Sequence, residues 1–338
     1  MADMNGPNGR GGWDRLDGRD DHVDHDEDRA QIILITGLTL AVLFVAVVLL
    51  LNTVIYTENL ATRGTDAGGA EAIEFRDGAV DDLAGIMYRE HRNRTSVSGV
   101  ADDFVTSAET YAETVATLRA RDGVVADVAV TVTETGYFVA QNETDSGFRE
   151  MTAPDGTTAN WTLANNVTRT RNYRLVVSPD DLASTPGSGF TVVADGSTVG
   201  TGATWSVSLS DATGDNLTVT VENESATVSG TFEPRPDGNH TLDLTGGTVN
   251  GEPFDALVWA EGVQNGSAPY DIRYENGDEA TGTYHFVVDD RDDGADADRS
   301  DRPYVAEAVY SAEVEVTHRT PELTYRDVIR LAPGERDA

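Results

Sequence analysis

Hydrophobic and polar positions divide this chain into a polar tail, one apolar run and a long body in which the two kinds alternate. Residues 32–56 contain no charged side chain. As a helix these 25 residues would extend about 37 Å, enough to cross a hydrocarbon core of about 30 Å. A helix that is apolar on every face is typical of a membrane span. The pattern therefore predicts a transmembrane or filament-core helix over residues 31–56.

The helical pattern continues after this run, which predicts a helical stalk over residues 57–122. Ile73, Val80, Leu83 and Met87 recur at the spacing of one helix face. The pair Gly68–Gly69 predicts a break in the helix before that face begins.

A second amphipathic helix is expected before Gly123, which would end it. Asp102 and Asp103 fall in its first turn, where the helix dipole favours acids. Its apolar stripe consists of Phe104, Ala108, Tyr111, Val115 and Leu118. We expect this stripe to pack on the domain's own sheet, and a seam for a partner is the alternative.

From Val124 onward the apolar period changes to two, which predicts short strands. Alternation begins at Val128, and Gly136 before Tyr137 predicts a hairpin. Further strands are expected at 173–177, 190–194, 205–209, 217–221, 226–232, 241–244, 257–260, 271–274, 283–288, 306–316 and 323–331. Turn pairs such as Asn250–Gly251 favour antiparallel neighbours.

The predicted fold class is therefore α+β. An N-terminal transmembrane helix continues into amphipathic helices and is followed by an antiparallel, sandwich-like β domain over residues 123–331. The interval 178–245 is a candidate insertion of hairpins, and residues 332–338 form a C-terminal tail.

The charge of the chain constrains its stability. It contains 59 acidic and 24 basic residues, and its formal net charge is -35. Self-repulsion of this size requires screening by salt. All basic residues are Arg, and this acidic, lysine-free composition is similar to that of proteins from salt-loving archaea. A chain without a basic face is not expected to bind nucleic acid. The absence of Cys excludes disulfides and thiolate metal sites.

Residues 1–30 form an acidic tail that contains too few apolar residues to order itself. We expect it to be disordered and cytoplasmic, or a leader that is removed. His22 and His25 stand among carboxylates and could hold a metal, but a solvated tail is the expected role.

Asn-X-Ser/Thr sequences indicate that the body lies outside the cell. Eight of the 12 Asn residues in 60–338 begin such a sequence, about four times the chance expectation. These candidate glycosylation sites are Asn93, Asn142, Asn160, Asn166, Asn216, Asn223, Asn239 and Asn265. The tail carries four Arg, against two in the twenty residues after the helix, which favours a cytoplasmic N-terminus. The prediction is a single-pass cell-membrane protein with an extracellular C-terminal domain.

No catalytic, cofactor or metal site is expected from the body. In the acidic loop 289–301, Asp289, Asp293 and Gly294 fall at positions 1, 5 and 6 of a calcium loop. However, Arg291 occupies position 3, which should supply a ligand, and Ser300 occupies position 12, where Glu is expected. A solvated loop is therefore the preferred interpretation. The histidines His91, His240, His285 and His318 stand apart in the sequence and make no zincin pattern, and no serine occupies a nucleophile elbow. We do not expect an enzyme.

The sequence Arg29-Ala30-Gln31-Ile32 places a basic, a small and a polar residue directly before the apolar helix. It resembles the processing site of archaeal type IV pilin-like precursors. The resemblance implies a membrane peptidase as partner, cleavage between Ala30 and Gln31, and self-association or association with other pilin-like subunits through the apolar helix. The fifth residue of the mature chain would be Ile35, where many pilins carry Glu.

Three functions remain open at this point. The first is a glycosylated, pilin-like subunit of a surface structure, held in the lipid bilayer or in a filament core by its helix. The second is a bitopic cell-envelope protein that does not assemble. The third, and least favoured, is an anchored extracellular hydrolase.

Overall fold

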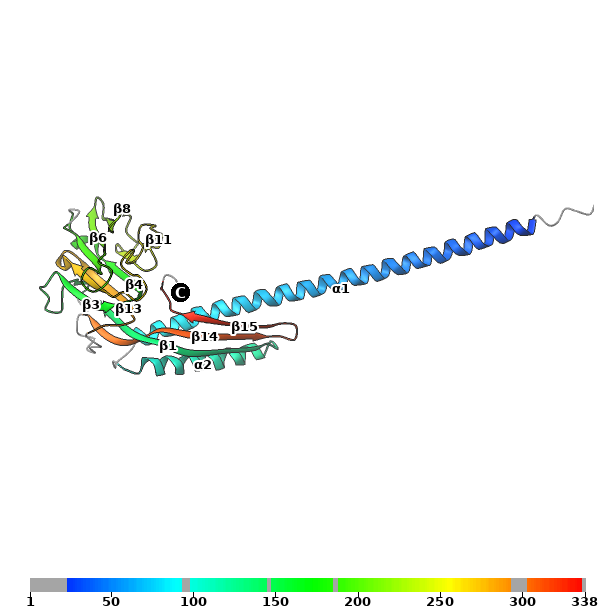
Figure 1. The fold of residues 1–338 in the computed structure, drawn as a ribbon, viewed down its shortest axis with the longest axis horizontal. Coiled ribbons are helices and arrows are strands. Elements are labelled where there is room, and N and C mark those ends of the chain that lie inside the picture. The colour runs from blue at the N-terminus through cyan, green and yellow to red at the C-terminus, as the bar shows by residue number, and fades with distance from the viewer. Residues whose placement is uncertain (1–22, 93–97, 145–146, 185–187, 293–302, 336–338) are drawn as a thin grey trace, which may run out of the picture. The chain divides into compact units, whose positions relative to one another are not determined.

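The computed structural model describes residues 23–92, 98–144, 147–184, 188–292 and 303–335. Contacts divide the chain into two compact units, residues 1–67 and 68–338. Helix α1 (Val23–Arg92) belongs to both (Figure 1). Its continuity corrects the expected break, because Gly68 and Gly69 lie inside the helix. α1 also begins within the acidic tail, at Val23.

In the second unit, α1 buries a stripe that differs in part from the predicted one. Leu83 and Met87 are buried as expected, whereas Ile73 is 53% exposed. Phe75 occupies the buried position instead, one helix turn away from Ala79. The prediction was wrong here because the apolar residues before residue 80 are compatible with two different faces of the helix. Only the packing against the sheet determines which face is buried.

Helix α2 (Val100–Ala120) confirms the second predicted helix. Phe104 and Ala108 are buried, Asp102 and Asp103 lie in the first turn, and Gly123 adopts φ 78° just after the helix. The C-terminal end of the predicted stripe is wrong, because Leu118 is 51% exposed.

Two antiparallel sheets make up the β-rich part, which confirms an α+β fold with a sandwich. The nine-stranded sheet has the order β11 (Glu252–Pro253), β10 (Thr248–Val249), β9 (His240–Asp243), β4 (Thr170–Val177), β13 (Thr281–Val288), β1 (Val125–Gln141), β14 (Tyr304–Arg319), β15 (Thr324–Leu331), with β2 (Arg149–Glu150) also beside β13. The six-stranded sheet has the order β3 (Trp161–Val167), β12 (Tyr270–Glu275), β5 (Phe190–Asp195), β6 (Thr204–Ala212), β7 (Asn216–Glu222), β8 (Thr227–Phe232). Single 3-10 turns occur at Pro179–Asp181 and Gly277–Glu279.

The main core lies between the two sheets and is rich in aromatic side chains. Tyr173 packs on Phe286 with ring centroids 4.6 Å apart, and Trp205 packs edge-on against Trp259 at 5.2 Å. A second core lies between the two helices and the ribbon formed by β1, β14 and β15 (Figure 1). The second unit therefore combines a sandwich with a helix-covered three-stranded ribbon.

Most predicted strands are present, but the two-residue strands β2, β10 and β11 were not predicted. Strand β3 was missed, and the predicted strand at 257–260 is a buried turn in which Ala260 has φ 50°. The strands of 178–245 divide between the two sheets and pair with strands outside that interval, as β5 does with β12 and β9 with β4.

Gly136 does not form a hairpin, which corrects the sequence-based expectation. β1 continues through it, with a bulge at residues 132–135. A Cβ atom at Gly136 would lie 2.1 Å from the backbone oxygen of Val288 on β13. This glycine is needed for a close approach between two strands, not for a turn.

Gly136→Ala should therefore destabilise the fold by about 1–3 kcal/mol, because a backbone atom has to move. Gly85→Ala is the matched control, since nothing lies within 4 Å of its Cβ position on α1. That control should gain up to about 1 kcal/mol from helix propensity. Thermal unfolding of the detergent-solubilised chain in molar salt measures both. Equal midpoints for the two variants would refute this role for Gly136.

Candidate functional site

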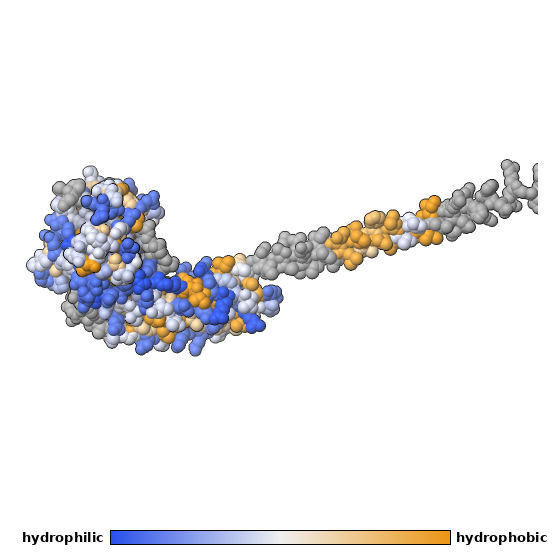
Figure 2. Space-filling view, in the orientation of Figure 1, coloured by the Kyte–Doolittle hydropathy of each residue, from blue (hydrophilic) through white to orange (hydrophobic). Residues whose placement is uncertain are grey.

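The surface of the first unit is dominated by the apolar segment Ile33–Leu51 of α1. Within the described residues it is the one helical segment long and apolar enough to cross a membrane, and none of it is buried. Figure 2 shows it as a stretch of hydrophobic surface. The Thr39 hydroxyl donates to the carbonyl of Ile35 at 2.7 Å, so this polar group is satisfied within the helix. Since none of the described residues buries it, the segment needs an apolar cover from elsewhere.

The residues of the candidate processing site, Arg29, Ala30 and Gln31, are consecutive positions of α1 directly before this segment. The Ala30–Gln31 bond therefore lies within α1, less than one helix turn before Ile33. The tail histidine His25 lies one turn earlier in the same helix, and His22 falls outside the described residues.

Seven of the eight glycosylation candidates lie in the described residues, and none of the seven is buried. Asn93 lies outside those residues. Asn142, Asn160 and Asn265 are exposed, and the other four are half-buried: Asn166, Asn216, Asn223 and Asn239. Two side-chain amides already donate to carboxylates, Asn166 to Asp292 at 3.3 Å and Asn223 to Glu261 at 2.9 Å. These two are the less accessible acceptors.

The histidine side chains of the second unit do not form one common site. His240 is hydrogen-bonded through both ring nitrogens, with Nε2 2.9 Å from the Asp215 carbonyl oxygen and Nδ1 3.0 Å from the Asn250 amide nitrogen. His91 Nε2 accepts from the backbone N–H of Val309 at 3.1 Å. His318 is buried, with Nε2 4.0 Å from the Glu71 carboxylate. All three occupy structural positions.

His285 is the strongest candidate for a pH effect on stability. Burial, aided by Arg92 and Arg174, lowers its pKa from 6.5 to about 4. Between these values the unfolded state binds the extra proton, so folding free energy is lost as pH falls from 6.5 toward 4. The loss should reach about 3 kcal/mol. His285→Phe, which keeps an aromatic ring beside Tyr88 and Phe138, should remove this component. Unfolding free energies of both proteins from pH 7 to pH 4 test it, and parallel curves would exclude the effect.

A cluster around the Tyr310 ring was not predicted from the sequence. The guanidinium groups of Arg169 and Arg171 lie 4.8 and 5.5 Å from the ring centroid. Arg171 is buried and donates to the carbonyl oxygens of Val309, Tyr310 and Pro333 at 2.6–3.0 Å. Burial lowers the pKa of Arg171 to about 10. Because this value is still well above 7, the side chain is charged at neutral pH. Arg171 joins β4, β14 and the C-terminal segment.

Arg169 links this cluster to the loop that had been weighed as a calcium site. It binds Glu134 at 2.9 Å, which lowers the pKa of Glu134, and Asp289 at 3.2 Å. Asp289 also accepts from the backbone N–H groups of Thr168 and Arg169 at 3.1 and 2.9 Å. Its carboxylate is occupied by protein donors, and loop residues 293–301 lie outside the described part of the chain.

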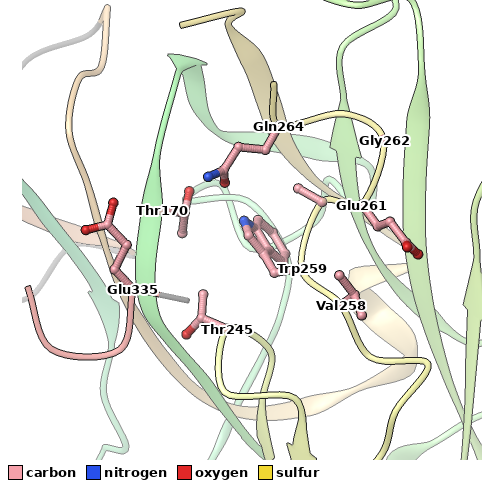
Figure 3. A pocket seen from close by; sticks show the side chains of 9 residues that line it. Thr170, Thr245, Val258, Trp259, Glu261, Gly262, Gln264 and Glu335 are labelled. Carbon is pink, nitrogen blue, oxygen red and sulfur yellow. The ribbon is translucent and has the colours of Figure 1, made fainter. Parts of the chain in front are cut away.

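A cavity of about 420 Å³ opens between the sandwich and the C-terminal segment (Figure 3). Trp259 lies at its centre, with Glu261 and Glu335 on opposite sides. The Trp259 indole N–H donates to the Tyr270 hydroxyl at 3.2 Å, and Glu335 is bound to Arg330. Thr170 and Gln264 also hydrogen-bond to the Tyr270 hydroxyl, at 2.8 and 3.4 Å, so three polar side chains that line the cavity are held by this one hydroxyl. Among the described residues, no group of three or more His, Asp or Glu could hold a metal ion.

Comparison with known proteins gives one similarity. Residues 26–166 match a family of unknown function (DUF7261). No curated protein matches the chain. No solved structure matches it either. The matched span runs from α1 through α2 and β1 into β3, so it includes the apolar segment and most of the elements that surround the second core.

Proposed function

We propose that this chain is a membrane-anchored, pilin-like structural subunit whose apolar helix is held in a bilayer or in the core of a filament. The observation that carries the proposal is the exposed surface of Ile33–Leu51. In this segment 14 large apolar side chains are 40% or more exposed. At about 1.5 kcal/mol or more for each side chain, covering them is worth on the order of 20 kcal/mol. Lipid or other apolar helices supply that cover.

The position of Arg29, Ala30 and Gln31 supports a pilin-like subunit over a plain anchor. A cut after Ala30 would remove nine acids and four Arg and leave an uncharged polar residue ahead of the apolar surface. Like-charged tails would otherwise repel one another at the base of a helix bundle. Ile35 in the fifth mature position favours the alternative, a bitopic envelope protein that stays in the bilayer.

Mechanical shearing of cells separates these two functions. A pilin-like subunit should be released in a sedimentable, high-mass surface fraction, because its helix is held by other helices. A bitopic envelope protein should stay in the membrane pellet. Recovery of the chain in the membrane fraction alone would decide for the alternative.

The second unit is proposed to lie outside the cell and to carry glycans. All seven described acceptor sites are at least partly accessible, as attachment of a glycan requires. A hydrolase remains the least supported function, since the cavity around Trp259 assembles no acid, base and nucleophile within reach of one another.

Glycan occupancy should follow accessibility of the Asn side chain. Asn142, Asn160 and Asn265 should be the most occupied, and Asn166 and Asn223 the least, because the amides of those two are bound to carboxylates. Intact glycopeptide mass spectrometry of native protein measures this order. Thr144→Ala should remove only the glycan on Asn142. Eight bare Asn residues, in cells that glycosylate other proteins, would count against an extracellular unit.

A further inference from the structure

The N-terminal half of β1 has a neighbour on one side only. β14 pairs with β1 from Val125 to Ala140, but β13 pairs with it only from Tyr137 to Gln141. Among the described residues, 125–135 therefore have one open side, which we call the β1 edge. It contains Val, Ala and Thr in alternation, with no Pro, Lys or Arg. An open strand of this kind is a template for another strand.

A groove runs beside the β1 edge. It has a volume of about 380 Å³ and is lined on the helix side by Ala108, Ala112 and Ala116 of α2. On the strand side it is lined by the four consecutive residues 127–130. Successive strand residues point to opposite faces, so a groove that touches all four opens along the strand's edge.

The nine-stranded sheet ends in a second open strand, β15, which pairs with β14 alone through all eight residues. The other sheet ends are shorter or irregular. β11 has two residues and contains Pro253, β8 is followed by Pro234 and Pro236, and β3 pairs irregularly with β12. In the described part of the chain, the two longest regular open edges are thus β15, over eight residues, and the β1 edge from Val125 to Val132, before its bulge.

Acidic side chains lie at the β1 edge, and two Arg side chains lie on β15. Asp127, Glu109 and Glu113 line the groove at the β1 edge. β15 presents Arg326 and Arg330, which are exposed and are ion-paired within their own copy, Arg326 to Glu315 at 2.7 Å and Arg330 to Glu335. A neighbouring acid would have to share these Arg side chains. In the sheet, Asp127 pairs with Thr317, and Thr317 pairs with Arg326, so Asp127 and Arg326 project from the same face. Two copies placed edge to edge would bring acid and Arg together.

We propose that β15 of one copy pairs with the β1 edge of the next, so that a single sheet continues from subunit to subunit. β1 and β15 are both antiparallel to β14, hence parallel to each other. Copies inserted in one membrane share a direction, so this pairing is between parallel strands. The inference rests on the proposed function only for this shared direction of the copies in a membrane. The contact is heterologous and leaves each added copy with an open edge, as growth of an assembly requires.

Cysteine cross-linking tests the pairing in the full chain, whose described residues contain no Cys. Val328→Cys on β15 would be co-expressed with Ala129→Cys, Thr131→Cys or Thr133→Cys, which sample the register along one face of β1. Within one copy, Ala129 and Val328 both pair with Glu315 and are two strands apart, about 9.6 Å. That exceeds the reach of a disulfide. Only neighbouring copies can therefore join.

A dimer on non-reducing gels of oxidised membranes is expected for at least one mixed pair and for none of the variants expressed alone. Ser229→Cys on β8 with Val328→Cys is the matched control and should stay monomeric. No dimer from any mixed pair, or a dimer from a β1 variant alone, would overturn the inference. The mature N-terminus, determined on the same samples, tests the proposed function separately. A chain that begins at Gln31 and does not cross-link would overturn the sheet pairing alone.

Charge exchange gives a second readout. Asp127→Arg should reduce the cross-linked fraction several-fold, and adding Arg326→Asp should restore it. The same low fraction in the single and the double exchange would argue against contact between these two edges.

Discussion

Transferred from molar salt to about 0.1 M salt, the second unit is expected to lose its β-sheet signal in one cooperative transition. Residues 68–338 contain 48 acids and 19 Arg, so 29 carboxylates lack a basic partner even if every Arg is paired with an acid. The Debye length is about 3 Å at 1 M and about 10 Å at 0.1 M, so dilution lets these carboxylates repel across the surface. Repulsion then opposes the compact state.

Circular dichroism and melting temperature across a salt series measure this effect. Sucrose at matched osmolality is the control, because it strengthens burial without screening charge. Salt should restore the fold and sucrose should not. An unchanged signal and melting point at about 0.1 M salt would show that self-repulsion does not limit this protein.

Local patterns were sufficient to predict much of the fold. The apolar helix and α2 follow from period and end signals, and most strands follow from alternation between turn residues. Asn250 and Gly251 have φ values of 55° and 86° in the turn between β10 and β11, as that pair favours. Each of these features depends on neighbours in the sequence.

Features set by distant contacts were not predictable. Gly136 is required by the oxygen of Val288, more than 150 residues away in the chain. Arg171 looks like a surface residue in sequence, but three carbonyl oxygens from β14 and the C-terminal segment allow its burial. The open β1 edge became visible only once β13 was seen to end at Val288.

The candidate sites show the same division. The Asn-X-Ser/Thr sequences could be located from the sequence, and the contacts that occupy Asn166 and Asn223 could not. Arg29, Ala30 and Gln31 were identified by motif alone, and the structure adds their place on α1.

Arg29→Glu or Ala30→Phe is expected to abolish assembly while leaving the chain in the membrane. Either change should block recognition by the peptidase, so the acidic tail stays attached and tails repel at the helix ends. The segment Ile33–Leu51 is untouched and still supplies the apolar surface for insertion.

Arg19→Glu is the matched control, because it makes the same charge change ten residues before Arg29. The control should be processed and recovered in the sheared surface fraction. The Arg29 and Ala30 variants should be full-length and confined to the membrane. Identical sedimentation of the Arg19, Arg29 and Ala30 variants would show that assembly does not depend on cleavage at Ala30.

The most direct test of a processed, pilin-like subunit is the N-terminal residue and intact mass of the native chain, purified from membranes and from the sheared surface fraction. The expected chain begins at Gln31 and lacks the 30 residues before it. A native chain that begins at or near Met1 in both fractions would contradict this function and leave the bitopic envelope protein in its place.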